Sequence, residues 1–159
     1  MHDIDVHIIH HKEPQWLLDR CIASMDGQPV NIHIVKGINE WPPFKGRALG
    51  FSKGSAKYVS YVDPDDVVLP GCFEKLLQYV GADLVWGNEG VVIEDGGETV
   101  HTNKSPHHAF LLKRGLDLDY SGSFRDVVNN HTLSRAHLDE TVYIWNYYLG
   151  TLCKRRGAK

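Results

Sequence analysis

Three carboxylates within four residues follow an apolar, β-prone run in this chain. The run spans residues 58–62 and leads directly into Asp63-Pro64-Asp65-Asp66. Carboxylates this close repel one another, so a fold that keeps them together at a strand end usually supplies a cation that neutralises them. The sequence therefore predicts a divalent metal at this turn. Asp and Pro are also common in turns and helix caps, so an acid-rich turn without a metal is the competing interpretation.

The segments that would position this turn alternate between strand and helix. Strands are predicted over 6–10, 30–35, 58–62 and 82–86, and helices over 14–25, 45–57 and 70–77. Such alternation indicates an α/β sheet that is largely parallel in its first half. Ligands of these sheets bind beyond the carboxyl ends of the strands, which is where the acidic turn falls.

The second half of the chain has a different character. Two β-rich pieces flank an Asp-Gly-Gly turn within 91–100 and predict a hairpin, and 109–112 predicts a short strand. Residues 121–135 indicate a mixed loop and helix. The aromatic run over 141–148 fits either a strand or a buried helix. Trp16 and Trp86 lie on apolar faces and are expected in the core.

Length and composition limit the class of protein. The 159 residues are 42% hydrophobic, which predicts one compact domain over 1–159. A net charge of −3 argues against a protein built chiefly to coat nucleic acid or an anionic membrane. The three cysteines form no Cys-x-x-Cys pair, so neither a disulfide framework nor a zinc ribbon is expected. The acidic N-terminus is unlike a signal peptide and no run is long enough for a membrane span, so we expect a cytoplasmic protein.

The residues that lead into the acidic turn carry a family resemblance. Gly46-Arg47-Ala48-Leu49-Gly50 is followed by Ala56-Lys57-Tyr58, a hydrophobic strand, the three aspartates and Pro70. This order and spacing resemble the family 2 glycosyltransferases, which are inverting enzymes with the A-type nucleotide-sugar-binding fold. The resemblance implies a Rossmann-like mixed α/β sheet flanked by helices. It covers residues 4–100 well, which would form the nucleotide-sugar-binding half, and it covers 101–159, the acceptor-side half, more loosely.

The resemblance also implies roles for individual residues. Asp63 would approach the ribose or the metal, and Asp65 would bind the Mn²⁺ or Mg²⁺ that bridges the donor diphosphate. Arg47 would contact the diphosphate. His10 and His11 occupy the loop that lies beside the nucleotide base in this family, although plain loop histidines are the competing interpretation.

Two departures from the family pattern concern the donor. The chain has Val35-Lys36-Gly37 where the family commonly has an acidic pair that helps to hold the base, and Ala48 stands where the family has an asparagine. The identity of the nucleotide therefore does not follow from the resemblance.

An inverting transferase needs a group that takes the proton of the acceptor hydroxyl. Asp126 stands at about the position where the family places an acidic pair, so it is the predicted base, with a helix-start aspartate as the competing interpretation. The histidine pairs 10–11 and 107–108 lack the spacing of a zinc enzyme, which argues against zinc catalysis.

Three functions are compatible with these residues. The preferred one is a metal-dependent transferase that moves a sugar from a nucleoside-diphosphate sugar to a hydroxyl acceptor. The others are a non-catalytic module that binds a nucleotide sugar or a metal, and a nucleotidyltransferase. The shortness of the chain suggests a large or flat acceptor, such as a polymer or a modified nucleic acid, or a homo-oligomer that completes the site.

Overall fold

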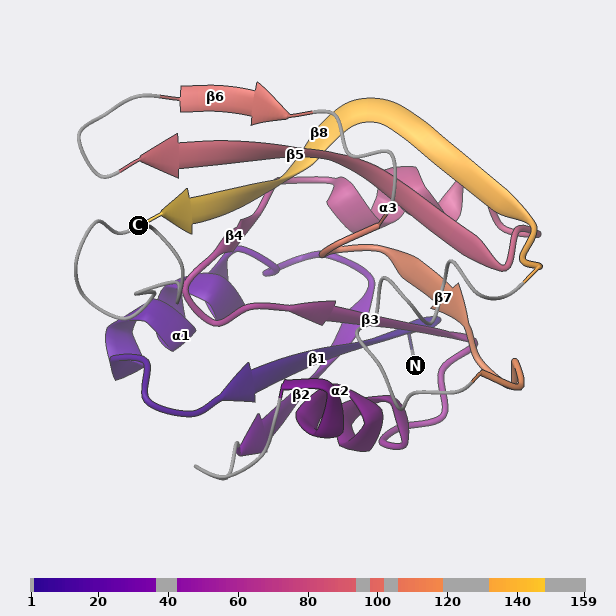
Figure 1. Cartoon of the computed structure of the whole chain (residues 1–159), viewed down its shortest axis with the longest axis horizontal. Helices are drawn as coiled ribbons and strands as arrows, with labels where there is room; N and C mark the ends of the chain where they lie inside the picture. Colours follow the sequence, from indigo (N-terminus) through magenta and orange to yellow (C-terminus); the bar gives the residue numbers. More distant parts are fainter. Residues whose placement is uncertain (1, 37–42, 94–97, 102–105, 119–131, 148–159) are drawn as a thin grey trace, which may run out of the picture.

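A computed structural model of the chain describes residues 2–36, 43–93, 98–101, 106–118 and 132–147. Its strands belong to one mixed sheet, which has the order β2-β1-β3-β7-β5-β8-β4 with β6 paired to β5 (Figure 1). The strands are β1 (Ile4–His10), β2 (Val30–Lys36), β3 (Tyr58–Val62), β4 (Val67–Val68), β5 (Leu84–Ile93), β6 (Glu98–His101), β7 (Leu111–Lys113) and β8 (Arg135–Tyr147). This is the mixed α/β sheet expected of the A-type glycosyltransferase fold.

Strand direction changes at the middle of the sheet. β1 pairs in parallel with β2 and β3, as the alternation of strands and helices predicts. β7 is antiparallel to both β3 and β5, and β8 then runs parallel to β5. Because β7 runs against β3, the residues that precede β7 lie at the same sheet edge as the residues that follow β3.

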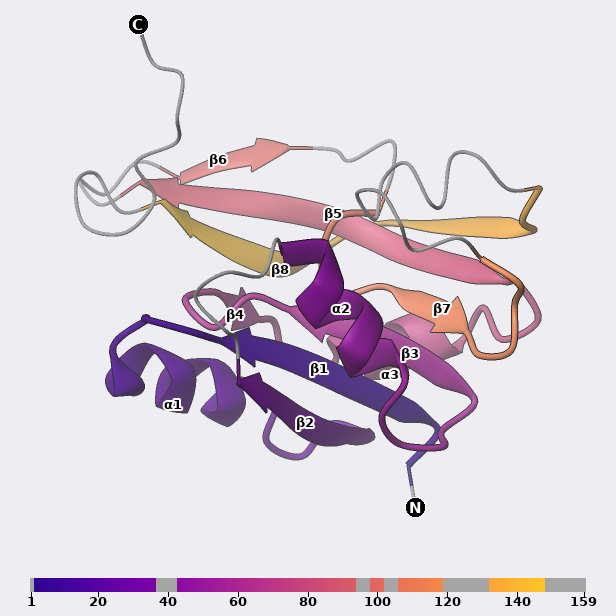
Figure 2. The same cartoon turned by 60° about the horizontal axis from the view of Figure 1, so that its bottom comes forward.

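Helices cover both faces of the sheet (Figure 2). α1 (Gln15–Ala23) and α3 (Cys72–Leu77) pack over one face, where Ile4, Val6 and Ile8 join the larger apolar cluster. α2 (Pro43–Phe51) covers the other face, and its Phe51 belongs to a second cluster with Val59 and Tyr61. Alternate residues of a strand point to opposite faces, so β3 supplies Tyr58 and Val62 to the larger cluster and Val59 and Tyr61 to the second. None of the helices in the described part of the chain is long and apolar enough to cross a membrane.

The structure corrects several predicted element bounds. α2 ends at Phe51 rather than near residue 57, and the aromatic run that fitted two alternatives belongs to strand β8. β5 continues to Ile93 instead of ending at Trp86, because Gly87 allows β8 to approach closely: a Cβ there would lie 2.7 Å from Val142 Cγ2. The hairpin is confirmed as the β5–β6 pair.

The two tryptophans expected in the core have different outcomes. Trp86 is buried, as predicted. Trp16 is 58% exposed, so its prediction was wrong. It lies one residue into α1, and the guanidinium of Arg20 lies over its ring, 5.6 Å from the centroid. The three-to-four spacing of apolar residues therefore did not place Trp16 correctly on the buried face of α1.

The α2–β3 connection depends on a glycine that lies against a buried acid. Gly54 has a φ of +73°, and a Cβ there would overlap the carboxylate of Asp5 on β1. Gly27 has a similar φ of +77° but nothing within 4 Å of its Cβ position. We expect Gly54→Ala to lower the free energy of unfolding by at least about 2 kcal/mol more than Gly27→Ala, because it adds overlap to the same backbone strain. Urea denaturation of both variants measures the difference, and equal losses would contradict it.

Candidate functional site

The acidic turn is at the carboxyl end of β3 and is held by a buried tyrosine. Tyr143 of β8 donates its hydroxyl to Asp66 Oδ2 at 2.6 Å and accepts the backbone N–H of Asp63 at 3.2 Å. Asp66 is fully buried. Burial, with the negative charges of Asp63 and Asp65, raises the pKa of Asp66 to about 8 despite the charge of His108. Asp66 therefore holds the turn in place from its buried side and is not exposed to a ligand.

Helix α1 holds the other side of this turn. Arg20 Nη2 donates to the carbonyl of Asp65 at 2.6 Å, and Cys21 Sγ donates to the carbonyl of Asp63 at 3.4 Å. These contacts satisfy backbone acceptors of the turn and do not involve the side chains of Asp63 and Asp65, which are half-buried. The side chain of Asp63 is 36% exposed.

A buried histidine contacts the first aspartate of the turn. His108 Nε2 donates to Asp63 Oδ2 at 3.0 Å, and the His108 side chain is only 1% exposed. Burial alone would lower the pKa of His108, but the carboxylates of Asp63 and Glu89 raise it to about 10. Burial would likewise raise the pKa of Asp63, yet His108 and then Arg47 hold it well below its usual range. The two side chains therefore form an ion pair at neutral pH.

A second carboxylate lies behind this histidine. Glu89 of β5 is 5% exposed and accepts the backbone N–H of His108 at 2.8 Å. Its Oε1 lies 3.5 Å from His108 Nδ1, and its Oε2 lies 3.5 Å from His107 Nδ1. Burial raises the pKa of Glu89, but both histidines lower it to about 2 overall, so this residue remains ionised.

Arg47 of α2 brings a positive charge to the same edge. Its guanidinium lies over the Tyr61 ring, 4.0 Å from the centroid, with Nη2 3.8 Å from Asp63 Oδ1. Its buried Nε has no hydrogen-bond partner in the part of the chain that the structure describes. His10 and His11 follow the carboxyl end of the neighbouring β1; His10 Nε2 bonds to the carbonyl of Glu13 at 2.8 Å, and His11 is exposed.

Within the described part of the chain, two overlapping groups of side chains have ligand atoms within 4.8 Å of one another and could hold a metal: Glu89 with His107 and His108, and Asp63 with Asp66 and His108. Asp66 and His108 are buried and already paired, whereas Asp63 and Asp65 are half-buried. Burial and the charge of Asp63 raise the pKa of Asp65. The carboxylate oxygens of this turn suit a hard divalent cation.

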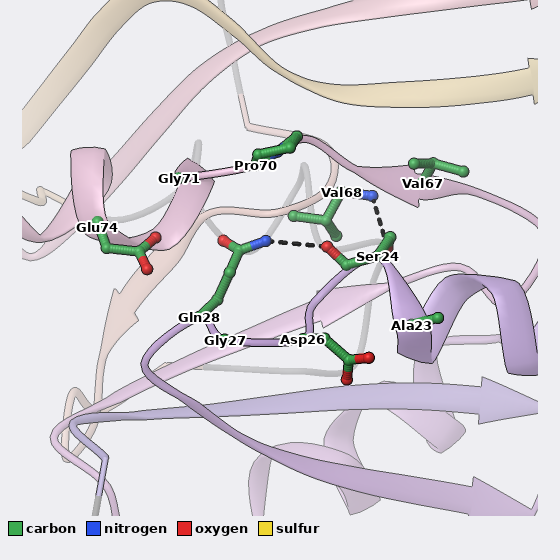
Figure 3. Close-up of a pocket in the computed structure, with 10 residues that line it drawn as sticks. All are labelled: Ala23, Ser24, Asp26, Gly27, Gln28, Val67, Val68, Pro70, Gly71 and Glu74. Carbon is green, nitrogen blue, oxygen red and sulfur yellow. Dashed lines mark hydrogen bonds between the residues drawn. The ribbon is translucent and has the colours of Figure 1, made fainter.

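A cavity of about 390 Å³ adjoins the residues that follow the acidic turn in the sequence (Figure 3). It is bounded by the end of α1, by β4 and by the start of α3. Ser24 Oγ accepts the backbone N–H of Val68, and Gln28 Nε2 donates to the carbonyl of Ser24. None of the three aspartates of the turn lines this cavity.

The structure places Arg47 Nη2 3.8 Å from Asp63 Oδ1, at the sheet edge where Asp65 also lies. Asp126, the predicted base, lies outside the described residues. Sequence reasoning missed the part of Glu89 in the site, and it gave His107 and His108 no role there. The signal available for the two histidines was their position directly before a predicted strand. Only the antiparallel direction of that strand, however, places His108 beside Asp63.

Comparisons with known proteins identify the family of the chain and support its fold. The model of a family described as glycosyl transferase family 2 matches residues 18–141. A solved structure of TarS residues 1–349 from S. aureus has a TM-score of 0.63 and 10% identity, covering 91% of this chain and 60% of that one. The bifunctional IspDF of Campylobacter jejuni has a TM-score of 0.52 and 9% identity, covering 87% of this chain and 50% of that one. The chain thus spans less than two thirds of either structure. No curated protein matches it.

Proposed function

Because this chain belongs to glycosyl transferase family 2, we propose that it transfers a sugar from a nucleoside-diphosphate sugar to a hydroxyl acceptor with inversion at the anomeric carbon. The observation that carries the proposal is the meeting of Asp63, Asp65 and Arg47 at the carboxyl end of β3. Carboxylates and a guanidinium at one edge suit a donor diphosphate with a divalent cation. The match of the family model to residues 18–141 supports the same activity.

Asp63 and Asp65 would hold the cation, Mn²⁺ or Mg²⁺, through their carboxylate oxygens. The bound cation offsets the negative charge that develops on the leaving nucleoside diphosphate. His108 keeps Asp63 oriented and ionised, and Arg47 lies close enough to contact the diphosphate. Its guanidinium can donate charge-assisted hydrogen bonds to phosphate oxygens.

In this proposal the chain is a single domain in which residues 4–100 bind the donor and residues 101–159 face the acceptor. His10 and His11, at the end of β1, are proposed to lie beside the nucleotide base. Asp126 remains the residue that the family resemblance predicts as the catalytic base. The acceptor is proposed to be large or flat, such as a polymer or a modified nucleic acid.

A thermal-shift screen tests donor binding. UDP-glucose, UDP-N-acetylglucosamine, GDP-mannose and dTDP-glucose are each added with and without Mn²⁺ to the wild type, Asp65→Asn and Asp3→Asn. A donor at about 100 times its Kd should stabilise the wild type by about 2.7 kcal/mol. We expect Asp65→Asn to lose the Mn²⁺-dependent part and Asp3→Asn, an exposed acid before β1, to keep it. No shift with any donor would contradict the proposal.

The product formed from a stabilising donor separates the competing functions. Free nucleoside diphosphate indicates glycosyl transfer or hydrolysis at the anomeric carbon, whereas sugar 1-phosphate indicates cleavage between the two phosphates, as in nucleotidyl transfer. Donor binding without either product would indicate a non-catalytic module. Chromatography of the nucleotide products distinguishes all three outcomes.

A further inference from the structure

A buried histidine nitrogen beside the acidic turn lacks a hydrogen bond. His108 donates from Nε2 to Asp63 Oδ2 at 3.0 Å, whereas its Nδ1 has no hydrogen-bond partner among the described residues. The side chain of His108 is 1% exposed, so this nitrogen is shielded from bulk water. Because nearly all buried polar atoms in folded proteins are paired, an orphaned one calls for an explanation such as a bound ion.

Two neighbouring side chains place further ligand atoms around this nitrogen. Glu89 Oε1 lies 3.5 Å from His108 Nδ1, and Glu89 Oε2 lies 3.5 Å from His107 Nδ1. A Zn²⁺ ion held tetrahedrally by imidazole nitrogens and a carboxylate has bonds of about 2.1 Å, which puts its ligand atoms about 3.4 Å apart. The two nitrogen–oxygen separations are close to this spacing. One ion could therefore contact all three side chains.

Asp63 holds the ring of His108 in the orientation that a metal ligand needs. Since Nε2 donates to Asp63, the neutral ring has its lone pair on Nδ1, the nitrogen that lies beside Glu89. Histidine ligands of metals commonly donate their other ring nitrogen to a carboxylate, which fixes the ring and raises its basicity. A bound metal would take the place of the Nδ1 proton and leave the bond to Asp63 intact.

The surrounding fold keeps these side chains in position and leaves one of them open to solvent. Glu89 belongs to β5 and also accepts the backbone N–H of His108 at 2.8 Å. The ring of His107 packs against Trp145 of β8, with centroids 6.1 Å apart, and its side chain is 34% exposed. An ion can enter past His107, and the three protein ligands leave the fourth tetrahedral position to water.

We propose that Glu89, His107 and His108 form a zinc site. It is separate from the cation proposed at Asp63 and Asp65, and it does not depend on the proposed function. Two imidazoles and a carboxylate suit Zn²⁺, whereas oxygen ligands alone suit Mg²⁺. The zinc has a positioning role: it ties β5 to the residues before β7 and holds His108, and through it Asp63, in place. It takes no part in the sugar transfer itself.

Zn²⁺ binding to the protein stripped of metal with a chelator tests the site without any donor. Zn²⁺ is titrated by calorimetry in excess Mg²⁺, which occupies the oxygen ligands of the acidic turn. We expect one Zn²⁺ per chain, and an affinity at least about 100-fold lower in His107→Gln. Asp65→Asn and His2→Gln, a change at an exposed histidine before β1, should bind Zn²⁺ as the wild type does. The melting temperature without metal shows that each variant is folded.

Co²⁺ in place of Zn²⁺ gives a readout of the coordination itself. A tetrahedral Co²⁺ ion absorbs visible light much more strongly than an octahedral one. We expect the strong absorption in the wild type, Asp65→Asn and His2→Gln, and its loss in His107→Gln and Glu89→Gln. His107 is partly exposed, so its variant keeps the test valid if the buried Glu89→Gln fails to fold.

Three outcomes would overturn the proposal. The first is a wild type that binds no Zn²⁺ in excess Mg²⁺. The second is equal Zn²⁺ affinity in the wild type and His107→Gln, which would locate the ion at others of the ten histidines. The third is a loss of Zn²⁺ binding in Asp65→Asn but not in His107→Gln, which would place the ion at the acidic turn. Because no donor is present, each of these results is distinct from a failure of the proposed sugar transfer.

Discussion

Replacing Asp63 with asparagine should lower the rate of nucleoside diphosphate release by about 1,000-fold, equivalent to about 4 kcal/mol in the activation barrier. The substitution removes the charge that we assign to cation binding. It also removes a carboxylate partner of His108, whose side chain is 1% exposed. The imidazole would then lose the carboxylate that accepts from its Nε2 and keep Glu89 beside Nδ1, and the orientation of the acidic turn would be less well defined.

The loss should appear in binding as well as in rate. In Asp63→Asn we expect the Mn²⁺-dependent part of the donor thermal shift to disappear, because the asparagine amide is a weaker cation ligand than a carboxylate. Asp3→Asn serves again as the matched control, since it makes the same chemical change at an exposed site. The melting temperature without ligand separates lost folding from lost function. A folded Asp63→Asn protein that retained more than a tenth of the wild-type rate would remove Asp63 from the cation site.

The parts of the site that are local in sequence could be predicted from it. The acids follow a run of β-prone residues, and the order of strands and helices places that run inside a sheet, so its carboxyl end is a ligand edge. Gly46 and Arg47 stand at a fixed spacing before the same strand, which made Arg47 identifiable. In each case the signal lies within about twenty residues of Asp63.

The histidine and glutamate part of the site depends on strand direction, which local patterns do not encode. His108 reaches Asp63 because β7 runs antiparallel to β3, and Glu89 reaches His108 because β5 pairs with β7. The sequence pattern also predicted, wrongly, that β5 ends at Trp86. Gly87 interrupts a β-prone run, which indicates a strand end. The glycine is needed there because Val142, on a strand more than fifty residues away in the sequence, approaches it closely.

Replacing Asp5 with alanine should lower the free energy of unfolding by about 3–5 kcal/mol and the melting temperature by about 10 °C. Asp5 is on β1 at the edge opposite the acidic turn, and its side chain is 2% exposed. It accepts Arg114 Nη2 at 2.7 Å, the backbone N–H of Ala56 at 2.8 Å and a bond from His33 Nε2 at 2.9 Å. Alanine would leave these donors without their acceptor in a largely dry site.

The pH dependence of this contribution follows from the direction of the pKa shift. Burial raises the pKa of Asp5, but the bonds from His33 and from the Ala56 backbone outweigh it and lower the pKa below its usual value. A carboxyl whose pKa is depressed in the folded state stabilises the fold above its unfolded pKa, near 3.9, and loses this contribution as the pH falls below that value. The wild type should therefore lose stability between about pH 4 and pH 2 more steeply than Asp5→Ala.

A double-mutant cycle with Arg114 distinguishes a specific ion pair from a general loss of packing. Arg114 also donates to the carbonyls of Phe51 and Ala56, at 2.7 and 2.8 Å, so Arg114→Ala alone should be costly. The double variant should cost less than the two single losses added, because neither charge is then left buried without its partner. Glu140→Ala is the control: it breaks an exposed pair with Lys75, at 2.6 Å, and should cost at most about 1 kcal/mol. Urea denaturation gives all four values, and an Asp5→Ala loss no larger than that of Glu140→Ala would show that the buried network does not hold β1 to the end of β7.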